Sequence, residues 1–386
     1  MKILAATSSF PSNSSPQAGL FVAQWRDYLM ERGHQIDVLR PEGTLGVPTD
    51  PSFKTWGPLL KGHGAPEYLD KSGWKGVYGV IAQTAGMYID YVDLPKSYDL
   101  IVGHWLLPWG LFPTNGYPMH LYAHGSDVAL LERLPRWLGT MLARRIMKNA
   151  SGITFVSENL RSRFKAITNT SWRCTHNVQP MGVFRTQPDV TLTKQLKASG
   201  RADFTVTALG RLVPIKGIDV LIRAMDSIQG CRLLIAGDGP ERSRLERLAQ
   251  AQSSRVTFLG HVTPSQREAL LQQTDLFVQC SRMIEHRQEG CPIALLEALD
   301  TGVPAIVSAT GGMRELAKTA GLSCVQSNDP FALKAIIEKH VHDREFHKQQ
   351  RRLALKQSNQ WTWPTMVAQH ESILLASCAQ NAILPK

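Results

Sequence analysis

The second half of the chain repeats one pattern, in which a short apolar segment is followed by a turn and then by a segment of helical period. This alternation predicts parallel β-strands, because consecutive parallel strands need a crossover connection that is usually a helix. The predicted strands are Phe204–Leu209, Arg232–Ala236, Val256–Leu259, Leu276–Cys280 and Val303–Ser308. The predicted helices are Gly217–Ile228, Glu241–Ala251, Ser265–Gln273, Pro292–Asp300 and Met313–Ala320. The region is therefore constrained to a doubly wound α/β sheet.

The first half follows the same alternation. A strand is predicted at Lys2–Ser9 and a helix from Gly19 to Arg32, which Gly33 ends in the manner of a C-cap glycine. Further strands are predicted at Gln35–Arg40, Asp99–His104, Met119–Ala123, Gly152–Ser157 and Cys174–Val183, with helices at Val77–Tyr91, Leu131–Asn149 and Glu158–Lys165. The stretch from Pro41 to about Val77 has no clean period, so we expect either a long functional loop or a poorly ordered insertion.

The length of the chain predicts two domains, because 386 residues exceed what one ordinary core supports. We place a first Rossmann-like domain at residues 1–183, a polar linker at 184–203 and a second Rossmann-like domain at 204–360. A Trp-rich tail at 361–378 contains a helix that needs a surface to bury against. We expect this C-terminal helix to cross back and complete the first domain, and the two domains to face each other across a cleft.

The composition indicates which partners the protein binds and which cellular compartment it occupies. The formal net charge of +11 favours anionic partners such as nucleotides, anionic lipid or nucleic acid. The basic residues are dispersed without an aromatic-interleaved basic run, so we expect no nucleic acid. Six scattered cysteines without a CxxC pair predict reduced cytosolic thiols and argue against structural zinc. The absence of a long apolar run and a strand-like Met1–Thr7 predict neither a transmembrane helix nor a signal peptide.

The predicted helix Leu131–Asn149 has two unlike faces. One face carries the basic residues with a tryptophan, and the other carries apolar residues that would pack on a core. The two sets are Arg133, Arg136, Arg144, Lys148 and Trp137 on one side, and Leu138, Leu142 and Ile146 on the other. A basic face with a Trp can rest on an anionic membrane surface, and the alternative is a solvated face over a core stripe.

Two carboxylates frame the run Glu289-Gly-Cys-Pro-Ile-Ala-Leu-Leu-Glu297. Pro292 fits the first turn of a helix, and a helix N-terminus attracts an anion such as a diphosphate. A carboxylate in the turn and another in the helix can accept hydrogen bonds from hydroxyls on either side of that anion. Sugar, diphosphate and ribose in that order describe a nucleotide sugar. The alternative is a solvated helix with two surface glutamates.

Other polar and glycine-rich groups follow the predicted strands. Arg211 and Lys216 flank the turn after the first strand of the second domain, where two cations suit a diphosphate. Gly237-Asp-Gly-Pro240 and Thr310-Gly-Gly312 are tight turns in which glycine allows a ligand to approach the backbone. In the first domain, His104 and His124 stand where strands leave the sheet. Either histidine can be structural or part of a site.

These motifs together resemble the retaining GT-B glycosyltransferases of glycosyltransferase family 4. In the second domain the resemblance rests on Gly210-Arg211, Lys216-Gly217, Gly237-Asp-Gly-Pro240, Glu289 with Glu297-Ala298, Gly302-Val-Pro304, Gly311-Gly312 and Glu315. In the first domain it rests on Gly19, His104-Trp105 with Pro108, and His124-Gly-Ser-Asp127. Two features depart from the family pattern. Ala18-Gly19 replaces a Gly-Gly pair, and Cys291 stands where an aromatic or aliphatic residue is more usual.

The resemblance implies a role for each matching residue. Arg211 and Lys216 would bind the donor diphosphate, Glu289 the donor sugar and Glu297 the ribose. His124 would reach the donor sugar from the opposite domain, and Asp127 would face the acceptor or orient His124. The implied donor-binding set is Gly19, Arg211, Lys216, Gly237, Glu289, Gly290, Cys291, Pro292, Ile293 and Glu297, the acceptor-binding set is His104, Trp105 and Asp127, and the catalytic set is His124, Glu289, Arg211 and Lys216.

The resemblance also implies the reaction. We expect sugar transfer with retention of configuration from a nucleoside-diphosphate sugar, UDP- or GDP-linked, to a sugar, glycolipid or small-molecule acceptor in cell-envelope or related glycoconjugate synthesis. We expect no cofactor and no metal, because the cations would replace it and Asp90-Tyr-Val-Asp93 is not a DxD site. The expected location is cytoplasmic, including the inner face of the cell membrane. The alternatives are a nucleotide-sugar 2-epimerase or hydrolase of the same fold, and a basic nucleic-acid-binding protein.

Overall fold

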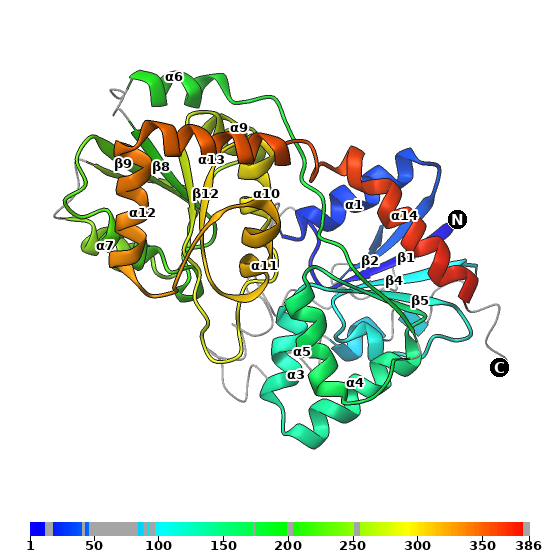
Figure 1. Ribbon diagram of the computed structural model, residues 1–386. Helices are drawn as coiled ribbons and strands as arrows, with labels where there is room; N and C mark the ends of the chain where they lie inside the picture. Colours follow the sequence, from blue (N-terminus) through cyan, green and yellow to red (C-terminus); the bar gives the residue numbers. More distant parts are fainter. Residues whose placement is uncertain are drawn as a thin grey trace. The chain divides into compact units, whose positions relative to one another are not determined.

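The computed structural model describes residues 1–11, 18–40, 43–45, 84–88, 91–92, 97–172, 174–198, 204–250 and 255–380. The chain divides into two compact units, one formed by Met1–Met181 with Met366–Lys386 and the other by Gly182–Thr365. Each unit is a layered α/β structure in which helices cover a central sheet (Figure 1). The predicted fold class of two Rossmann-like domains is confirmed.

The first unit is built on a sheet whose strands are almost all parallel. Its strands are β1 (Lys2–Thr7), β2 (Gln35–Arg40), β3 (Gly43–Leu45), β4 (Leu100–His104), β5 (Met119–Ala123), β6 (Gly152–Phe155) and β7 (Thr175–Val178). Their order is β3-β2-β1-β4-β5-β6-β7, and β3 alone among these strands pairs antiparallel, with β2. Every residue of β4 and β5 is buried, as the continuous apolar character of strands covered on both faces requires.

Helices cover this sheet, and one of them comes from the far end of the chain. The helices are α1 (Leu20–Glu31), η1 (Trp109–Leu111), α3 (Ser126–Arg133), α4 (Arg136–Asn149), α5 (Glu158–Thr168) and α14 (Trp363–Gln380). From α14, His370 bonds to Tyr122 at 2.9 Å and Ser377 bonds to His120 at 2.8 Å. Figure 1 shows α14 lying along the first unit, so the predicted return of the C-terminal helix is confirmed.

The predicted single helix Leu131–Asn149 is wrong, because the structure has two helices here. Arg133 ends α3, and Arg136 begins α4. Leu134 between them has an extended backbone with ψ of 154°. The cause is Pro135, because a proline ring clashes with a helical conformation at the residue before it. Of the predicted helix Val77–Tyr91, the structure describes 84–88 and Tyr91 as helical, while most of the stretch 41–77 and the residues Asp90 and Asp93 lie outside the described ranges.

The second unit carries a six-stranded, wholly parallel sheet. Its strands are β8 (Phe204–Leu209), β9 (Cys231–Ala236), β10 (Val256–Gly260), β11 (Leu276–Gln279), β12 (Ala305–Ser308) and β13 (Ser323–Val325). Their order is β10-β9-β8-β11-β12-β13. The strand order reverses between β8 and β11, and ligands of such sheets bind outside the carboxyl ends of the strands at this switch point.

The helices of the second unit lie against two apolar clusters, one on each face of the sheet. They are α6 (Val190–Ala198), η2 (Pro214–Lys216), α7 (Ile218–Ala224), α8 (Arg242–Leu248), α9 (Pro264–Gln272), α10 (Ile293–Asp300), α11 (Gly311–Ala320), α12 (Pro330–His342) and α13 (Arg344–Gln357). The polar linker predicted at 184–203 is wrong in part, because α6 lies within it and buries Leu196 in the core. Asp189 accepts a hydrogen bond from the backbone N–H of Leu192 at 2.8 Å and so stabilises the start of α6.

Candidate active site

Lys216 is held at the switch point of the second sheet by the backbone that follows it. Gly217 has a φ of +64°, and a Cβ atom at this position would lie 2.1 Å from the carbonyl oxygen of Cys280. The thiol of Cys280 also donates to the carbonyl oxygen of Gly217 at 3.1 Å. The loop after β8 is therefore clamped to the residue that follows β11. Glycine is required here because any side chain would separate the two strand ends.

Glu289, in the loop after β11, forms an ion pair with Lys216, which follows β8. The Nζ atom of Lys216 lies 2.8 Å from Oε1 of Glu289, and their side chains are 17% and 18% exposed. The backbone of Glu289 is fixed by α11, because its carbonyl oxygen accepts from the N–H of Gly312 at 3.2 Å. A Cβ atom on Gly311 would lie 2.0 Å from that oxygen. The loops after β8, β11 and β12 thus bring a half-buried cation and a half-buried carboxylate together.

The N-terminus of α10 lies three residues beyond Glu289. Pro292 is the N-cap residue, so α10 begins at Ile293, one position after the predicted start, and no side chain caps its N-terminus. The carbonyl oxygen of Pro292 accepts from the backbone N–H of Leu295 at 3.1 Å. The partial positive charge of a helix N-terminus therefore lies close in sequence to Glu289, the partner of Lys216. Gly290, Cys291 and Ile293 complete this turn.

Cys291 contributes a neutral thiol to the turn. Burial raises its pKa to about 12, and the nearby charges of Glu289 and Glu315 raise it further. The side chain therefore stays protonated at neutral pH and does not act as a nucleophile. All six cysteines are free. Within the described ranges, His, Cys, Asp and Glu side chains do not gather in groups of three that could hold a metal ion.

Glu297 lies just over one turn along α10 and has an unusual carboxyl group. Burial raises its pKa to about 7, although the guanidinium of Arg267 opposes this rise. The Nη1 atom of Arg267 lies 3.3 Å from Oε1 of Glu297. Its Oε2 atom is buried and bonds to no other described residue. This oxygen is an acceptor without a donor, which is costly in a buried site unless a ligand supplies the hydrogen bond.

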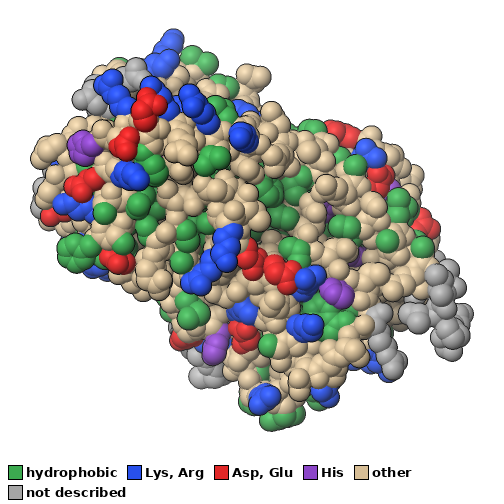
Figure 2. All heavy atoms as spheres, in the orientation of Figure 1, with side chains coloured by type: hydrophobic (Ala, Val, Ile, Leu, Met, Phe, Trp, Pro, Cys, Tyr) green, Lys and Arg blue, Asp and Glu red, His purple; other side chains and the backbone are tan. Residues whose placement is uncertain are grey.

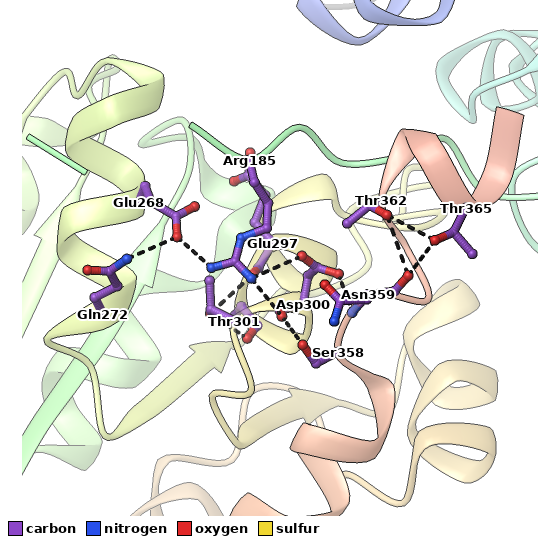
Figure 3. Close-up of polar contacts among 11 residues, drawn as sticks. Arg185, Glu268, Gln272, Glu297, Asp300, Thr301, Ser358, Asn359, Thr362 and Thr365 are labelled. Atoms are coloured by element: carbon purple, nitrogen blue, oxygen red, sulfur yellow. Dashed lines mark hydrogen bonds and ion pairs between the residues drawn. The ribbon is translucent and has the colours of Figure 1, made fainter. Parts of the chain in front are cut away.

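A polar network that the sequence did not reveal fixes the far end of α10 (Figure 3). Arg185 lies between two carboxylates, with Nη2 2.8 Å from Oε1 of Glu268 and Nη1 3.7 Å from Oδ2 of Asp300. Asp300 is the last residue of α10, and its Oδ1 atom accepts from the backbone N–H of Asn359 at 2.8 Å. The network therefore holds the helix that carries Glu297. No local pattern marks Arg185, because its partners lie far away in sequence.

Two glycines of the predicted donor set have a structural cause. A Cβ atom on Gly237 would lie 1.9 Å from the carbonyl oxygen of Gly210, so this glycine lets two neighbouring loops pack together. A Cβ atom on Gly19 would lie 2.1 Å from the carbonyl oxygen of Ser9, and Gly19 caps α1 with a φ of 60°. Part of the loop before Gly19 lies outside the described residues. Arg211 is exposed directly after β8 and Gly210.

The predicted residues of the first unit form a cluster of rings. His104 ends β4 and His124 follows β5, so the pairing of these strands brings the two side chains together. Their Nδ1 and Nε2 atoms lie 3.2 Å apart and their rings stack at 5.5 Å. Phe21 and Trp105 contact the His124 ring, with centroid distances of 4.9 Å and 4.8 Å. Trp105 has a φ of 75°, a strained conformation for a bulky residue that is typical of functional sites.

Burial revises two of the predicted acceptor contacts. His104 is 0% exposed, so its side chain contacts His124 and not an acceptor. Asp127 is 4% exposed, and its carboxylate accepts from the backbone N–H groups of Leu106, Gly125 and Val128 at 2.8–3.0 Å. These bonds fix the turn that follows His124, in agreement with the alternative that Asp127 orients His124. Trp105 and His124 remain partly exposed.

The surface of α4 combines basic and apolar side chains. Trp137 is 69% and Met141 51% exposed, whereas Ile146 on the opposite side of the helix is fully buried. Figure 2 shows basic and hydrophobic side chains together at the end of the first unit that carries α3 and α4. A groove of about 780 Å³ is lined by Arg136, Trp137, Thr140, Met141, Arg144, Ala166, Ile167 and Asn169. Among the described helices, none is both long enough and apolar enough to cross a membrane.

Parts of this chain are similar to known glycosyltransferases. The family model described as glycosyl transferases group 1 matches residues 193–357, which is most of the second unit. A GDP-mannose-dependent alpha-(1-6)-phosphatidylinositol monomannoside mannosyltransferase of Mycobacterium tuberculosis is 33% identical over 202 residues. That alignment spans 50% of this chain and 52% of the relative, so the chain matches about half the length of this relative.

Two further proteins match over nearly the whole chain. The putative teichuronic acid biosynthesis glycosyltransferase TuaC of Bacillus subtilis is 27% identical over 375 residues, covering 89% of this chain and 90% of the relative. The structure of Anabaena HepE in complex with UDP has a TM-score of 0.70 at 16% identity, covering 97% of this chain and 100% of that one. The fold of both units is thus shared with a solved structure. The second unit therefore matches the glycosyl transferases group 1 model over residues 193–357, and the fold of the chain is of the GT-B type.

Proposed function

We propose that the chain is a hexosyltransferase that moves a sugar from a nucleoside-diphosphate sugar to an acceptor hydroxyl, with retention of configuration. The ion pair between Lys216 and Glu289 supports this proposal most strongly, because it lies at the switch point of the second sheet. In this proposal Lys216 binds the diphosphate, and Glu289 accepts hydrogen bonds from the hydroxyls of the donor sugar. Glu297, with its unpartnered Oε2 atom, accepts from the ribose.

The proposed chemistry needs charge stabilisation and no protein nucleophile. The bond from the anomeric carbon to the diphosphate oxygen breaks, and the acceptor oxygen bonds to that carbon from the same face. The acceptor proton passes to the departing diphosphate. Negative charge therefore grows on the diphosphate, where Lys216, Arg211 and the N-terminus of α10 provide positive charge.

We propose a UDP- or GDP-linked donor and an acceptor of the cell-envelope glycolipid or polysaccharide class. The relatives support this choice, because one is named a GDP-mannose-dependent mannosyltransferase of a phosphatidylinositol mannoside and another is named for teichuronic acid synthesis. A thermal-shift screen against nucleoside diphosphates and nucleotide sugars tests the donor. A ligand at about 100 times its Kd should stabilise the protein by about 2.7 kcal/mol. Failure of every nucleotide to raise Tm would contradict the proposal, and donor consumption without acceptor would indicate an epimerase or hydrolase.

Nucleotide affinity should rise with pH through neutrality because of Glu297. Its pKa of about 7 leaves the carboxyl half protonated at neutral pH, and ribose hydroxyls stabilise the ionised form, so binding releases a proton. Between pH 6 and pH 8 the ionised fraction rises about tenfold at most, and Kd for the nucleotide sugar should fall by up to that factor. Calorimetry of wild type and Glu297→Gln checks this. Any pH dependence of Kd that remains in Glu297→Gln comes from titration of the phosphates. If Kd changes equally with pH in both proteins, Glu297 does not bind the ribose.

Chelation should leave transfer unchanged. In the proposed site, Lys216 and Arg211 neutralise the diphosphate, which is the task of a divalent cation in metal-dependent enzymes. Turnover in excess EDTA should therefore equal turnover in added Mg²⁺ or Mn²⁺. The control is a metal-dependent glycosyltransferase assayed in the same buffers. Loss of activity in EDTA that added Mg²⁺ or Mn²⁺ restores would show that the reaction needs a metal.

We further propose that the α4 surface binds anionic membrane, which would bring the chain to a lipid-linked acceptor. Exposed Trp137 and Met141 would enter the interface while Arg136 and Arg144 bind anionic headgroups. The protein should float with phosphatidylglycerol vesicles and not with phosphatidylcholine vesicles.

A triple variant, Arg136→Ala, Trp137→Ala and Arg144→Ala, should stay at the bottom of the gradient. The matched control removes two arginines and one exposed apolar residue from α13 of the second unit, as Arg351→Ala, Arg352→Ala and Leu355→Ala. Equal flotation of both triple variants would show that net charge, and not the α4 surface, drives binding.

A further inference from the structure

The first unit contains a row of buried rings whose hydrogen bonds can be assigned in part. The Nε2 atom of His370 lies 3.1 Å from the carbonyl oxygen of Pro180, which can only accept, so Nε2 carries the proton. The Nδ1 atom of His370 is then an acceptor, and the hydroxyl of Tyr122 donates to it at 2.9 Å. The Tyr122 ring stacks on His104 at 5.0 Å. The hydroxyl proton of Tyr122 is therefore already committed to α14.

His104 has one paired and one unpaired ring nitrogen. Its Nδ1 atom lies 3.2 Å from Nε2 of His124. Its Nε2 atom is buried and bonds to no other described residue. A buried N–H without an acceptor is rarer in proteins than a buried lone pair without a donor. The proton of His104 is therefore assigned to Nδ1, and the Nδ1–H group donates to Nε2 of His124.

This assignment determines the state of His124. Because its Nε2 atom accepts from His104, the proton of a neutral His124 lies on Nδ1. Among the described contacts of His124, Nε2 is the nitrogen engaged with His104, so Nδ1–H is the group left for a substrate. The side chain is partly exposed, unlike that of His104.

We propose that His104 is a positioning residue that holds His124 as the Nδ1–H tautomer, so that His124 presents a hydrogen-bond donor and not a base to the substrate. This inference rests on the proposed function, together with the role that the family resemblance implies for His124, which is to reach the donor sugar. A donor stabilises negative charge or binds a sugar oxygen, and it takes no proton from the acceptor hydroxyl. This agrees with a reaction in which the departing diphosphate receives that proton.

Electrostatics keep both imidazoles neutral, as a fixed tautomer requires. Burial lowers the pKa of His124 to about 3, and a protonated His370 would lower it further. Burial likewise lowers the pKa of His104. The charges that His124, His370 and His120 would carry if protonated lower it further. The groups that face the pair are the neutral rings of Trp25, Tyr122, Phe21 and Trp105.

Nitrogen NMR of the whole protein, labelled with ¹⁵N-histidine, tests the tautomer without any substrate. The resonances of His124 are assigned by their loss in His124→Gln. At neutral pH they should show a protonated Nδ1 and a bare Nε2. A protonated Nε2 in wild type would overturn the proposal. The NMR spectrum does not depend on enzyme activity. A protein that binds no nucleotide can still show the expected tautomer of His124, so failure of the proposed function can be told apart from failure of this proposal.

Two variants of His104 separate positioning from packing. His104→Phe keeps a ring against Tyr122 and Trp25 but has no donor, whereas His104→Asn places an amide N–H₂ near the position of Nδ1. We expect His104→Phe to lose the single Nδ1–H state of His124 and to lower kcat about tenfold to 100-fold, as loss of a residue that orients a functional group does. His104→Asn should restore both. An unchanged tautomer and kcat in His104→Phe would overturn the proposal, and if neither variant folds the wild-type spectrum decides.

Discussion

Replacing Lys216 with alanine should lower kcat for sugar transfer by at least about 100-fold with donor saturating. The ammonium lies at the switch point of the second sheet, 2.8 Å from Glu289, on a loop clamped by Gly217 and Cys280. A preorganised charge stabilises the departing diphosphate without moving, so its removal acts mainly on the transition state. The measurement is initial rate against donor concentration.

Two controls make the Lys216 result specific. Lys318→Ala removes an exposed lysine from α11 of the same unit, so it matches the change in net charge and should leave kcat unaltered. Lys216→Ala also leaves the half-buried carboxylate of Glu289 without its cation, which can lower stability. The double variant Lys216→Met, Glu289→Gln removes both charges, and its Tm separates a folding defect from a catalytic one. Turnover of Lys216→Ala near that of wild type would remove Lys216 from the site.

Replacing Glu289 with alanine should also lower transfer by at least about 100-fold. The carboxylate has two tasks in the proposed site, because it orients Lys216 and accepts from the hydroxyls of the donor sugar. The binding data should separate these tasks. Glu289→Gln should weaken binding of the nucleotide sugar, whereas binding of the nucleoside diphosphate should stay equal or tighten, because Lys216 is then released to the phosphates.

Calorimetry with the two ligands checks this difference. The matched control is Glu246→Ala, which removes an exposed glutamate that pairs with Arg242 on α8 of the same unit. Equal losses of affinity for nucleotide sugar and nucleoside diphosphate in Glu289→Gln would contradict a sugar contact. They would instead assign Glu289 to positioning of Lys216.

Most of the sheet could be predicted from the sequence, because a strand buried on both faces is a short apolar run between turns. β2, β5 and β8 have the predicted bounds. Short edge elements were missed, and β13 is an example with three residues of which one is buried. The helices were predicted less completely than the strands. Pro135 split one predicted helix, and α6 went unpredicted because Leu196 is its one buried residue and gives no period.

The sequence predicted which residues of the candidate site follow the ends of strands, but it did not predict which of them contact one another. Parallel strands end at one edge of a sheet, so residues after β8, β11 and β12 had to lie near one another. The glycines were correctly expected at tight turns, but Gly237 and Gly311 face neighbouring backbone. His104 and Asp127 were expected at an acceptor, and their burial places them beside and beneath His124 instead.

The sequence by itself determined the doubly wound sheets and the places where polar residues follow the ends of strands. These follow from hydrophobic period and chain direction, which are local properties. Tertiary structure alone decided that Lys216 pairs with Glu289, that Glu297 has a buried Oε2 atom and a pKa of about 7, and that His104 bonds to His124. Each of these features depends on contacts with, or burial by, residues far apart in the chain. A local sequence pattern carries no information on such contacts.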